Sequence, residues 1–440
     1  MESVDALIHA RWIVPVEPAG TVLERHALAV RHGRIASLLP SEQARQRYQA
    51  AEVIELPRHA LIPGLVNAHT HAAMALLRGL ADDLPLMRWL QDHIWPVESR
   101  WAKADFVRDG VELAVAEMLM GGVTCFNDMY FFPEVAAPVV RDAGIRACLG
   151  LVVFDFPSAW GTGPEDYLHK GLALHDACKN DPLLSFVFAP HAPYTVSDVW
   201  LRKIRALADE LDLGVHTHLH ETADEVADSV KQHGARPFAR LQGLGLVTPA
   251  LQAVHMTQLT DAEIAECARS GVSVMHCPES NLKLGSGFCP VAKLQQAGVN
   301  VALGTDGAAS NNDLDMFGEM RSAALLAKGA SGDASVLPAA AVLRMATLGG
   351  AKAMGLDPHI GSLSAGKWAD VTAVDLGALN TQPVYDVHST LVYAAGRHQV
   401  SDVWVSGKRL LQERRLTGMD ADAIMRRAED WRDRIAAGRA

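Results

Sequence analysis

The sequence predicts an α/β protein: a (β/α)₈ TIM-type barrel with a small flanking β-sandwich domain formed from both chain ends. Three observations favour this fold. Eight short apolar runs alternate with helical patterns over roughly 250 to 300 residues, which is typical of such a barrel. The two chain ends share a different texture of short alternating strands. Histidines and carboxylates recur where the apolar runs end, and barrels of this kind carry their sites at the C-terminal ends of the strands.

Size and composition set limits on function. A chain of 440 residues can bury the core of one large barrel and a smaller domain. The net charge of -11 excludes a nucleic-acid footprint and disfavours anionic membranes. The first residues lack the basic segment and apolar core of a signal peptide, and no apolar run reaches the ~18 residues of a membrane-spanning helix. We therefore expect a cytoplasmic protein that acts on a small molecule.

The cysteines have no CxxC pair and no regular spacing, so we expect reduced thiols of a cytosolic protein instead of disulfides. A cysteine zinc site is disfavoured for the same reason, because such sites bring ligands in close pairs. Any metal must be bound by histidines and carboxylates. The six cysteines are Cys125, Cys148, Cys178, Cys267, Cys277 and Cys289.

The chain divides into four predicted parts. Residues 1–62 form the N-terminal part of the β-domain, residues 63–360 the barrel, residues 361–415 the C-terminal part of the β-domain, and residues 416–440 a terminal helix. Helical spacing of apolar residues against a charged face supports this last element. The short strands expected in the β-domain lie within 6–16, 26–39, 51–56, 361–376, 389–396 and 399–411.

The barrel strands are expected where apolar runs are rich in β-branched residues. A longer connection, residues 72–103, follows the first strand and is a candidate lid or substrate loop. The eight runs are 65–71, 122–129, 146–154, 184–194, 213–221, 251–259, 271–279 and 299–307. Helical patterns between them cover 105–120, 133–142, 164–178, 197–211, 222–241, 261–270 and 290–297.

Residues with metal-binding or acid-base chemistry stand at the predicted ends of five strands. His69 and His71 end the first run, and because side chains alternate along a strand, both point to the same side. Nineteen histidines placed at random would rarely coincide so often with the opening of a barrel. The remaining residues of this set are His191, His218 with Glu221, His255 and Asp306.

The fifth run contains three histidines, His216, His218 and His220, all on one face of the strand. At most one or two of them can contact one ion. We favour His218, because Glu221 follows three residues later and can turn back over the metal. His216 is then expected in a buried barrel layer, and His220 in an outer shell or loop.

His69, His71, His218 and Asp306 offer three nitrogens and one oxygen, a set that suits Zn²⁺ and would also accept Fe²⁺. A water in the remaining position would have its pKa lowered from ~15.7 toward ~7. Asp306 could bind the metal and also take the proton of this water.

Two further residues complete the predicted chemistry. His255 could orient the attacking water and stabilise charge, and Glu221 is placed to shuttle a proton to the substrate.

Six segments together resemble the amidohydrolase superfamily and, within it, the 5'-methylthioadenosine/S-adenosylhomocysteine deaminases. The resemblance runs over nearly the whole chain. It implies a metal-dependent barrel with a flanking β-domain from both chain ends. The segments are PGLVNAHTHAAMALLRGLADD, WPVES, HLHET, HCPESNLKLGSG, LGTDGAASNND and GSLSAGKWADV.

The resemblance also implies roles for single residues. It assigns the metal to the four ligands given above, the proton to the purine ring to Glu221, and the place beside the attacking water to His255. Glu98 in WPVES and His191 in PHAPY match substrate-contacting positions. A carboxylate at Glu98 can accept hydrogen bonds from two vicinal ribose hydroxyls.

The chain departs from the family pattern after the third strand. Some members place arginines there to meet the far end of the substrate, whereas residues 152–167 contain none and carry several aromatics. An apolar methylthio tail therefore fits better than an anionic amino-acid tail. The expected wall residues of the pocket are Trp89, Met87, Phe154 and Trp160.

The expected metal count is one divalent ion per chain. Relatives with two ions use a carbamylated lysine at the end of the fourth strand, and this strand has no lysine.

The expected activity is hydrolytic deamination of an adenine nucleoside, with 5'-methylthioadenosine first, adenosine next and S-adenosylhomocysteine last. Two alternatives remain. One is a related hydrolase of guanine, cytosine or a chloro-s-triazine, and the other is a non-catalytic assembly protein on the same fold. Outer helices with apolar faces leave open whether the chain forms a homo-oligomer.

Overall fold

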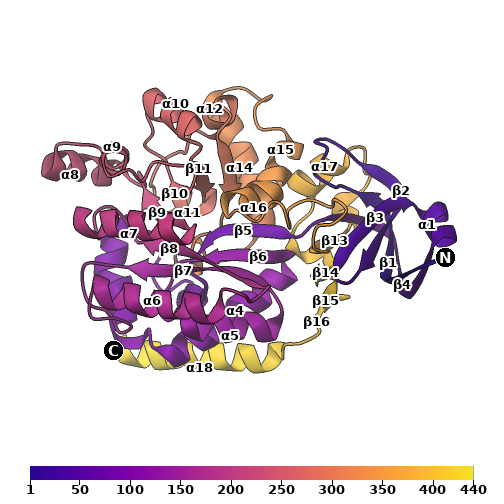
Figure 1. Ribbon diagram of the computed structural model, residues 1–440, viewed down its shortest axis with the longest axis horizontal. Helices are drawn as coiled ribbons and strands as arrows, with labels where there is room; N and C mark the ends of the chain where they lie inside the picture. Colours follow the sequence, from indigo (N-terminus) through magenta and orange to yellow (C-terminus); the bar gives the residue numbers. More distant parts are fainter. Residues whose placement is uncertain (440) are drawn as a thin grey trace.

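The computed structural model describes residues 1–439 and contains two eight-stranded sheets (Figure 1). One is the parallel sheet of the barrel, in the order β12-β11-β10-β9-β8-β7-β6-β5. The eight strands predicted from the apolar runs are all present. They are β5 (Leu65–Thr70), β6 (Val123–Asp128), β7 (Arg146–Val153), β8 (Leu184–Pro190), β9 (Gly214–Leu219), β10 (Leu251–His255), β11 (Ser273–His276) and β12 (Asn300–Leu303).

The sheet curves until its first and last strands meet, which makes it a nearly closed barrel. The amide of Asp306 donates to the carbonyl of His69 at 3.0 Å. Gly304 permits this approach, because a Cβ there would lie 2.7 Å from the backbone nitrogen of His69. Closure therefore brings the end of β5 against the segment that follows β12.

Helices surround the barrel, and most lie where the sequence predicts them. The predicted helix over 222–241 is wrong as one element, because Gly234 ends α8 with φ +68° and Pro237 begins α9. The helices that follow the strands are α4 (Ala104–Met120), α5 (Pro133–Ala143), α6 (Pro164–Cys178), α7 (Asp198–Leu211), α8 (Ala223–His233), α9 (Pro237–Gly243), α10 (Asp261–Ser270), α11 (Pro278–Lys283), α12 (Val291–Gln296), α13 (Ala308–Asn311), α14 (Met316–Ser331), α15 (Ala339–Arg344), η3 (Met345–Gly349) and α16 (Gly350–Ala353).

The connection after the first strand is mostly helical. Its four short segments pack over the C-terminal end of the barrel and supply residues to the pocket described below. They are η1 (Ala72–Leu77), α2 (Leu86–Trp89), η2 (Leu90–Ile94) and α3 (Trp95–Trp101).

The second sheet is mixed and combines the two chain ends, as predicted. Strand β13 (Val371–Asp375) pairs antiparallel with β4 (Tyr48–Pro63), so segments about 300 residues apart lie side by side (Figure 1). The other strands are β1 (Glu2–Ile13), β2 (Leu23–Arg31), β3 (Arg34–Pro40), β14 (Val400–Val405), β15 (Lys408–Gln412) and β16 (Arg415–Leu416), and α1 (Ser41–Arg47) connects β3 to β4.

One predicted strand of this region is wrong. Residues 389–396 continue a helical segment of α17 (Val387–Ser389) and the π-helical turn η5 (Thr390–Ala394). The Asp386 side chain caps its start by accepting from the amide of Ser389 at 2.8 Å. A short apolar run fits a buried helix as well as a strand, so pattern alone could not decide.

The terminal helix α18 (Ala421–Arg439) runs along the barrel beneath α4 and α5 (Figure 1). Ile424, Trp431 and Ile435 are buried on its inner face, as the spacing predicts. The Trp431 indole donates to Asp109 of α4 at 2.9 Å. Residue 440, the last of the predicted helix, lies outside the described residues.

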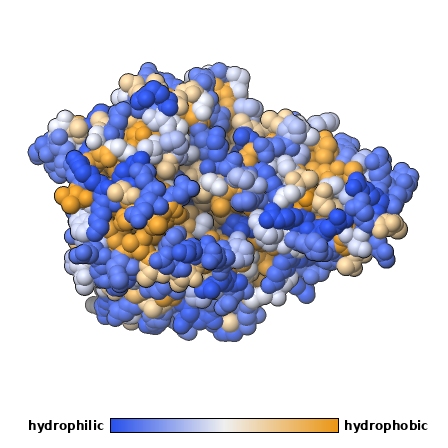
Figure 2. All heavy atoms as spheres, viewed as in Figure 1, coloured by the Kyte–Doolittle hydropathy of each residue, from blue (hydrophilic) through white to orange (hydrophobic). Residues whose placement is uncertain are grey.

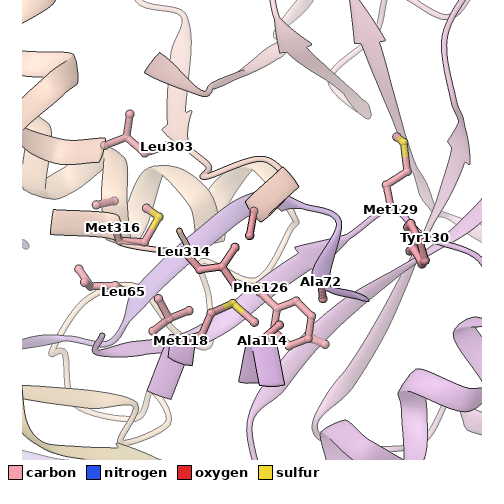
Figure 3. Packing of buried hydrophobic residues seen from close by; sticks show 14 of the residues in the cluster. Leu65, Ala72, Ala114, Met118, Phe126, Met129, Tyr130, Leu303, Leu314 and Met316 are labelled. Carbon is pink, nitrogen blue, oxygen red and sulfur yellow. The ribbon is translucent and has the colours of Figure 1, made fainter. Parts of the chain in front are cut away.

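The largest hydrophobic cluster fills the space between the barrel strands and the outer helices. Figure 3 shows part of it, with Phe126 of β6 beside Ala114 and Met118 of α4. Each fully buried large side chain contributes about 1.5–3 kcal/mol. Met129 and Tyr130, which follow β6, belong to the same cluster, so the C-terminal end of β6 is anchored in the core.

The face of the molecule in Figure 2 is largely hydrophilic, with an apolar area on the barrel side. Within residues 1–439, no helix combines the length and the apolar character needed to cross a membrane.

Candidate active site

Four side chains predicted at the ends of three strands meet at the C-terminal end of the barrel. The ligand atoms of His69, His71, His218 and Asp306 all lie within 4.8 Å of one another. Asp306 Oδ1 is 3.2 Å from His71 Nε2 and 3.4 Å from His69 Nε2. His218 Nε2 is 3.3 Å from His69 Nε2. Three nitrogens and one oxygen in this arrangement fit a divalent metal ion.

The second nitrogen of each histidine is held from behind. His71 Nδ1 donates to the carbonyl of Met129 at 2.5 Å, and His218 Nδ1 donates to the carbonyl of His191 at 2.8 Å. A carbonyl only accepts, so in the neutral form of each ring Nδ1 carries the proton and Nε2 keeps a lone pair for a metal. The donor set therefore fits a divalent cation in protonation state as well as in position.

Asp306 is held by two hydroxyls. Its Oδ2 accepts from Ser280 at 2.7 Å and from Ser310 at 3.1 Å, which leaves Oδ1 facing the histidines. Burial opposes ionisation, but hydrogen bonds with His69 and His71 outweigh it and hold the pKa of Asp306 well below its ordinary value. This carboxylate is thus available as an anionic ligand.

Glu221 and His255 lie beside the ligands. His255 Nε2 is 3.8 Å from Glu221 Oε2, and His255 Nδ1 donates to the Asn281 side-chain oxygen at 2.8 Å. Burial, with a contribution from the Asp306 charge, raises the pKa of Glu221 to about 8. The Glu221 carboxyl therefore holds a proton near neutral pH, while burial lowers the pKa of His255 and favours its neutral form.

The backbone around Glu221 is fixed by a second carboxylate. Glu225 accepts from the amides of His220 at 3.1 Å and Glu221 at 2.6 Å. His220 itself is fully buried, and its Nε2 accepts from the amide of Phe238 at 3.0 Å, so it points away from the ligands.

A pocket opens above the ligands, and Trp89, Glu98 and His191 all line it. The Tyr130 hydroxyl donates to Glu98 Oε1 at 2.7 Å, and burial raises the pKa of Glu98. His191 stacks on Phe154 with ring centroids 4.8 Å apart, and burial lowers the pKa of His191 to about 3. The pocket thus presents a carboxyl group at the lid and a neutral imidazole at the wall.

The outer part of this pocket is apolar. Leu86, Phe131, Phe154, Phe156 and Tyr194 line it, and no arginine or lysine does so within the described residues. Phe154 contacts both Phe131 and Phe156, with ring centroids 5.5 and 5.0 Å apart.

Two of the four wall residues expected from the sequence lie elsewhere. Trp160 is buried and donates its indole hydrogen to Glu134 at 3.0 Å, so it is a packing residue of the third-strand loop. Met87 faces an adjacent hollow that shares Leu86 and Tyr194 with the pocket.

Sequence reasoning missed several residues that organise the site. Ser280 and Asn281 stand inside the segment HCPESN, where a hydroxyl and an amide close to a predicted strand end could have been noticed. Tyr130 follows the end of the second strand in the same way. The partners of these residues are far away in the sequence, so only the fold could identify them.

Comparisons with known proteins agree with this geometry. The model of the amidohydrolase family matches residues 60–410. The chain is 51% identical to 5-methylthioadenosine/S-adenosylhomocysteine deaminases from Teredinibacter turnerae and Saccharophagus degradans, covering 99% of this chain and 99% and 98% of those proteins.

Solved structures show the same relationship. An adenosine deaminase from Xanthomonas campestris with bound zinc is 58% identical, with a TM-score of 0.98 and 99% of each chain covered. An atrazine chlorohydrolase from Arthrobacter aurescens superposes with a TM-score of 0.90 over 97% of this chain and 99% of that chain, but at 23% identity this likeness shows the fold alone.

A convergent histidine and carboxylate cluster in such a barrel suits a metal-dependent hydrolase, and the family model and the deaminase names of the relatives indicate action on carbon–nitrogen bonds. The chain belongs to the amidohydrolase family and, within it, to the family of the 5-methylthioadenosine/S-adenosylhomocysteine deaminases.

Proposed function

We propose that this chain removes the 6-amino group of adenine nucleosides by hydrolysis, with 5'-methylthioadenosine as the preferred substrate, adenosine next and S-adenosylhomocysteine last. The observation that carries the proposal is the position of Glu221, a buried and protonated carboxyl beside the four-ligand cluster. The names of the relatives, which include deaminases of these nucleosides, support the same choice.

One divalent ion per chain, Zn²⁺ first with Fe²⁺ as the alternative, would be held by His69, His71, His218 and Asp306, where it would make a water molecule acidic enough to react near neutral pH. Asp306 lies within the ligand cluster and accepts a proton from the attacking water. Because its pKa is low, it holds this proton only transiently.

Glu221 donates its proton to the ring nitrogen beside C6, which makes C6 electrophilic. The neutral His255, whose Nδ1 hydrogen is engaged by Asn281, offers Nε2 as an acceptor that orients the attacking water. Water gives one proton to Asp306 and adds to C6, which becomes tetrahedral. The amino group takes the proton from Asp306 and leaves as ammonia, while the new C6 hydroxyl returns a proton to Glu221 and becomes the carbonyl of the product. The product is the corresponding inosine-type nucleoside, and fixed groups around C6 favour the tetrahedral state over the flat substrate.

Glu98 binds the ribose in this proposal. The Tyr130 hydroxyl donates to Oε1 of the carboxyl group, and Oε2 accepts from the sugar hydroxyls. His191, stacked on Phe154, contacts the nucleoside from the opposite wall, and Trp89 packs against it from the lid.

The tail at the 5' carbon is selected by the apolar outer pocket. A methylthio group buries apolar surface against Phe154 and Phe156, which is worth about 25 cal/mol per Å². The α-carboxylate of S-adenosylhomocysteine would meet no arginine or lysine among the described lining residues, so it would lose hydration without a charged partner.

An assay of ammonia release over a panel of heterocycles tests the function. We expect the zinc-loaded chain to release ammonia from 5'-methylthioadenosine and adenosine. The rival proposal, a hydrolase of another heterocycle, gains support if guanine, cytosine or a chloro-s-triazine reacts while the adenine nucleosides do not. An assembly protein without chemistry would bind no metal and react with nothing in the panel.

The tail is tested in the same assay. We expect kcat/KM to be higher for 5'-methylthioadenosine than for S-adenosylhomocysteine by at least about tenfold, since an unpaired charge costs more than 1.4 kcal/mol. Equal values for the two substrates would contradict the apolar-tail assignment and leave the deaminase function intact.

We also propose a cytosolic location, which the chemistry of the cysteines supports. All six are buried thiols without disulfides in the described residues.

A further inference from the structure

A row of buried polar side chains lies inside the barrel, behind the metal ligands. His216 of β9, Gln252 of β10 and Asn127 of β6 are each 3% exposed or less. They do not line the active-site pocket. Buried polar groups are costly unless they are paired, so the way these three pair is informative.

The three side chains form a chain of hydrogen bonds that ends on a metal ligand. Gln252 Oε1 accepts from Asn127 Nδ2 at 2.8 Å and lies 3.0 Å from His216 Nδ1. His216 Nε2 lies 2.7 Å from Nδ1 of His69. His69 Nε2 in turn faces Asp306 and His218.

His69 differs from the other two histidine ligands in what stands behind it. His71 and His218 have backbone carbonyls at Nδ1, and a carbonyl accepts only, so the proton position is fixed. The partner of His69 is an imidazole, which can donate or accept. The proton position on His69 therefore depends on the group that His216 Nδ1 contacts.

The side-chain amide of Gln252 is that group, so its orientation determines the proton position on His69. With its oxygen toward His216, His216 Nδ1 carries a proton, His216 Nε2 accepts, and His69 Nδ1 donates, which leaves the lone pair of His69 Nε2 free for a metal. With the amide reversed, every proton moves along by one nitrogen, and His69 Nε2 carries a hydrogen that points at the other ligands. Asn127 Nδ2 stabilises the first arrangement, because it donates to the Gln252 oxygen at 2.8 Å, whereas its distance to His216 Nδ1 is 3.3 Å.

We propose that His216 and Gln252 are positioning residues that fix the tautomer of His69 and thereby set how tightly the chain holds its metal ion. Neither residue lines the active-site pocket or belongs to the four-ligand cluster. The inference rests on the metal site of the proposed function, and it concerns metal retention, which is measured without substrate.

Gln252→Met tests the inference, because methionine keeps the volume and removes the acceptor. The zinc-loaded full chain is mixed with a chromogenic chelator, and the rate and equilibrium of zinc loss are recorded. We expect the dissociation constant for zinc to rise about 10- to 100-fold, the range for lost partners of metal-bound histidines. Gln252→Glu, whose carboxylate only accepts, should restore retention to within a few fold of the unchanged chain.

Ser273→Ala is the matched control. Ser273 pairs with Gln252 in the strand register and is buried at the same level of the barrel, but its hydroxyl contacts Asn300 and not the His69 chain. It should hold zinc as the unchanged chain does. Thermal unfolding of each metal-free variant verifies folding. If Gln252→Met does not fold, Asn127→Ala replaces it and should also release zinc faster, by a smaller factor.

Unchanged zinc retention in Gln252→Met, or in Asn127→Ala when it is the variant used, would overturn the inference. Equal losses in Gln252→Met and Gln252→Glu would also overturn it, because they would show that packing, and not hydrogen-bond direction, matters. The deaminase proposal fails separately, if the unchanged chain holds zinc normally and releases no ammonia from any adenine nucleoside.

Discussion

At the N-terminal end of the barrel, where the β-domain docks, the buried Arg146 of β7 meets a complete set of partners. Its guanidinium donates to Asp370 at 3.1 and 3.4 Å, to the carbonyl of Pro182 at 2.5 Å and to Ser406 at 3.0 Å. At the C-terminal end, by contrast, the Nε2 atoms of His69, His71 and His218 converge with one carboxylate oxygen.

Both ends bury charged and polar groups, but the pairing differs. The Arg146 ion pair is satisfied within the chain and joins the two domains. The histidines are held by fixed partners on the side away from the cluster, and their Nε2 atoms converge on one another and on Asp306 Oδ1, an arrangement that requires a proton or a cation between them. A buried polar group whose partners all lie within the chain therefore indicates a structural role. A buried cluster whose ligand atoms converge on one point indicates a site for a bound ion.

The largest expected effect separates chemistry from metal binding at the C-terminal end. Glu221→Gln should lower kcat for 5'-methylthioadenosine by about 10²- to 10⁴-fold, the range for loss of a general acid, because the amide cannot donate the proton. The zinc content should stay at that of the unchanged chain. Glu165→Gln, at an exposed position on α6, is the control and should change neither quantity. A Glu221→Gln chain with the normal rate would remove Glu221 from the proposed mechanism.

The second prediction concerns the N-terminal end. Arg146→Met leaves Asp370 buried without its ion-pair partner and should lower the free energy of unfolding by about 3–5 kcal/mol. Chemical denaturation of the metal-loaded chain measures it. The folded fraction should keep its KM for 5'-methylthioadenosine, because no contact of Arg146 reaches the pocket. A large change in KM with unchanged stability would contradict the division between the two ends.

The third prediction tests the ribose contact by a double-mutant cycle. In the unchanged chain, replacing adenosine by 2',3'-dideoxyadenosine should lower kcat/KM by about 10- to 100-fold, as expected for hydrogen bonds to a charged group. In Glu98→Ala this difference should largely disappear, since the acceptor is gone. If the same penalty persisted in the variant, Glu98 would not be the ribose acceptor.

The smallest expected effect distinguishes packing residues from wall residues. Trp160→Phe removes the hydrogen bond to Glu134 and should leave KM for 5'-methylthioadenosine within about twofold, with a loss of roughly 0.5–1.5 kcal/mol in stability. Phe154→Leu, at a pocket-lining position, should raise KM for 5'-methylthioadenosine more than for adenosine. If Trp160→Phe raised KM more than Phe154→Leu, Trp160 and not Phe154 would be the wall residue of the pocket.

The strands and the residues at their ends were predictable because both depend on local pattern. Period-two alternation placed His69 and His71 on one side, and eight apolar runs between helices predicted that the strand ends would meet. The identity of His218 as the histidine in the cluster followed from its distance of three residues to Glu221.

What the sequence could not show depends on contacts between distant segments. The partner of Glu98 is Tyr130, and the partners of His216 come from three other strands. The apolar run at 389–396 fits a helix and a strand equally well, and packing decided it. Trp160 was expected in the pocket because aromatic residues cluster in its loop, yet its indole is turned to Glu134.

A zinc titration of the metal-free chain, followed by ammonia release from 5'-methylthioadenosine, tests the central claim most directly. Activity should be absent without metal, rise in proportion to added zinc and stop rising at one ion per chain. Full activity in the presence of a chelator that removes all metal, or a plateau reached only at two ions per chain, would contradict the single-metal deaminase proposed for this site.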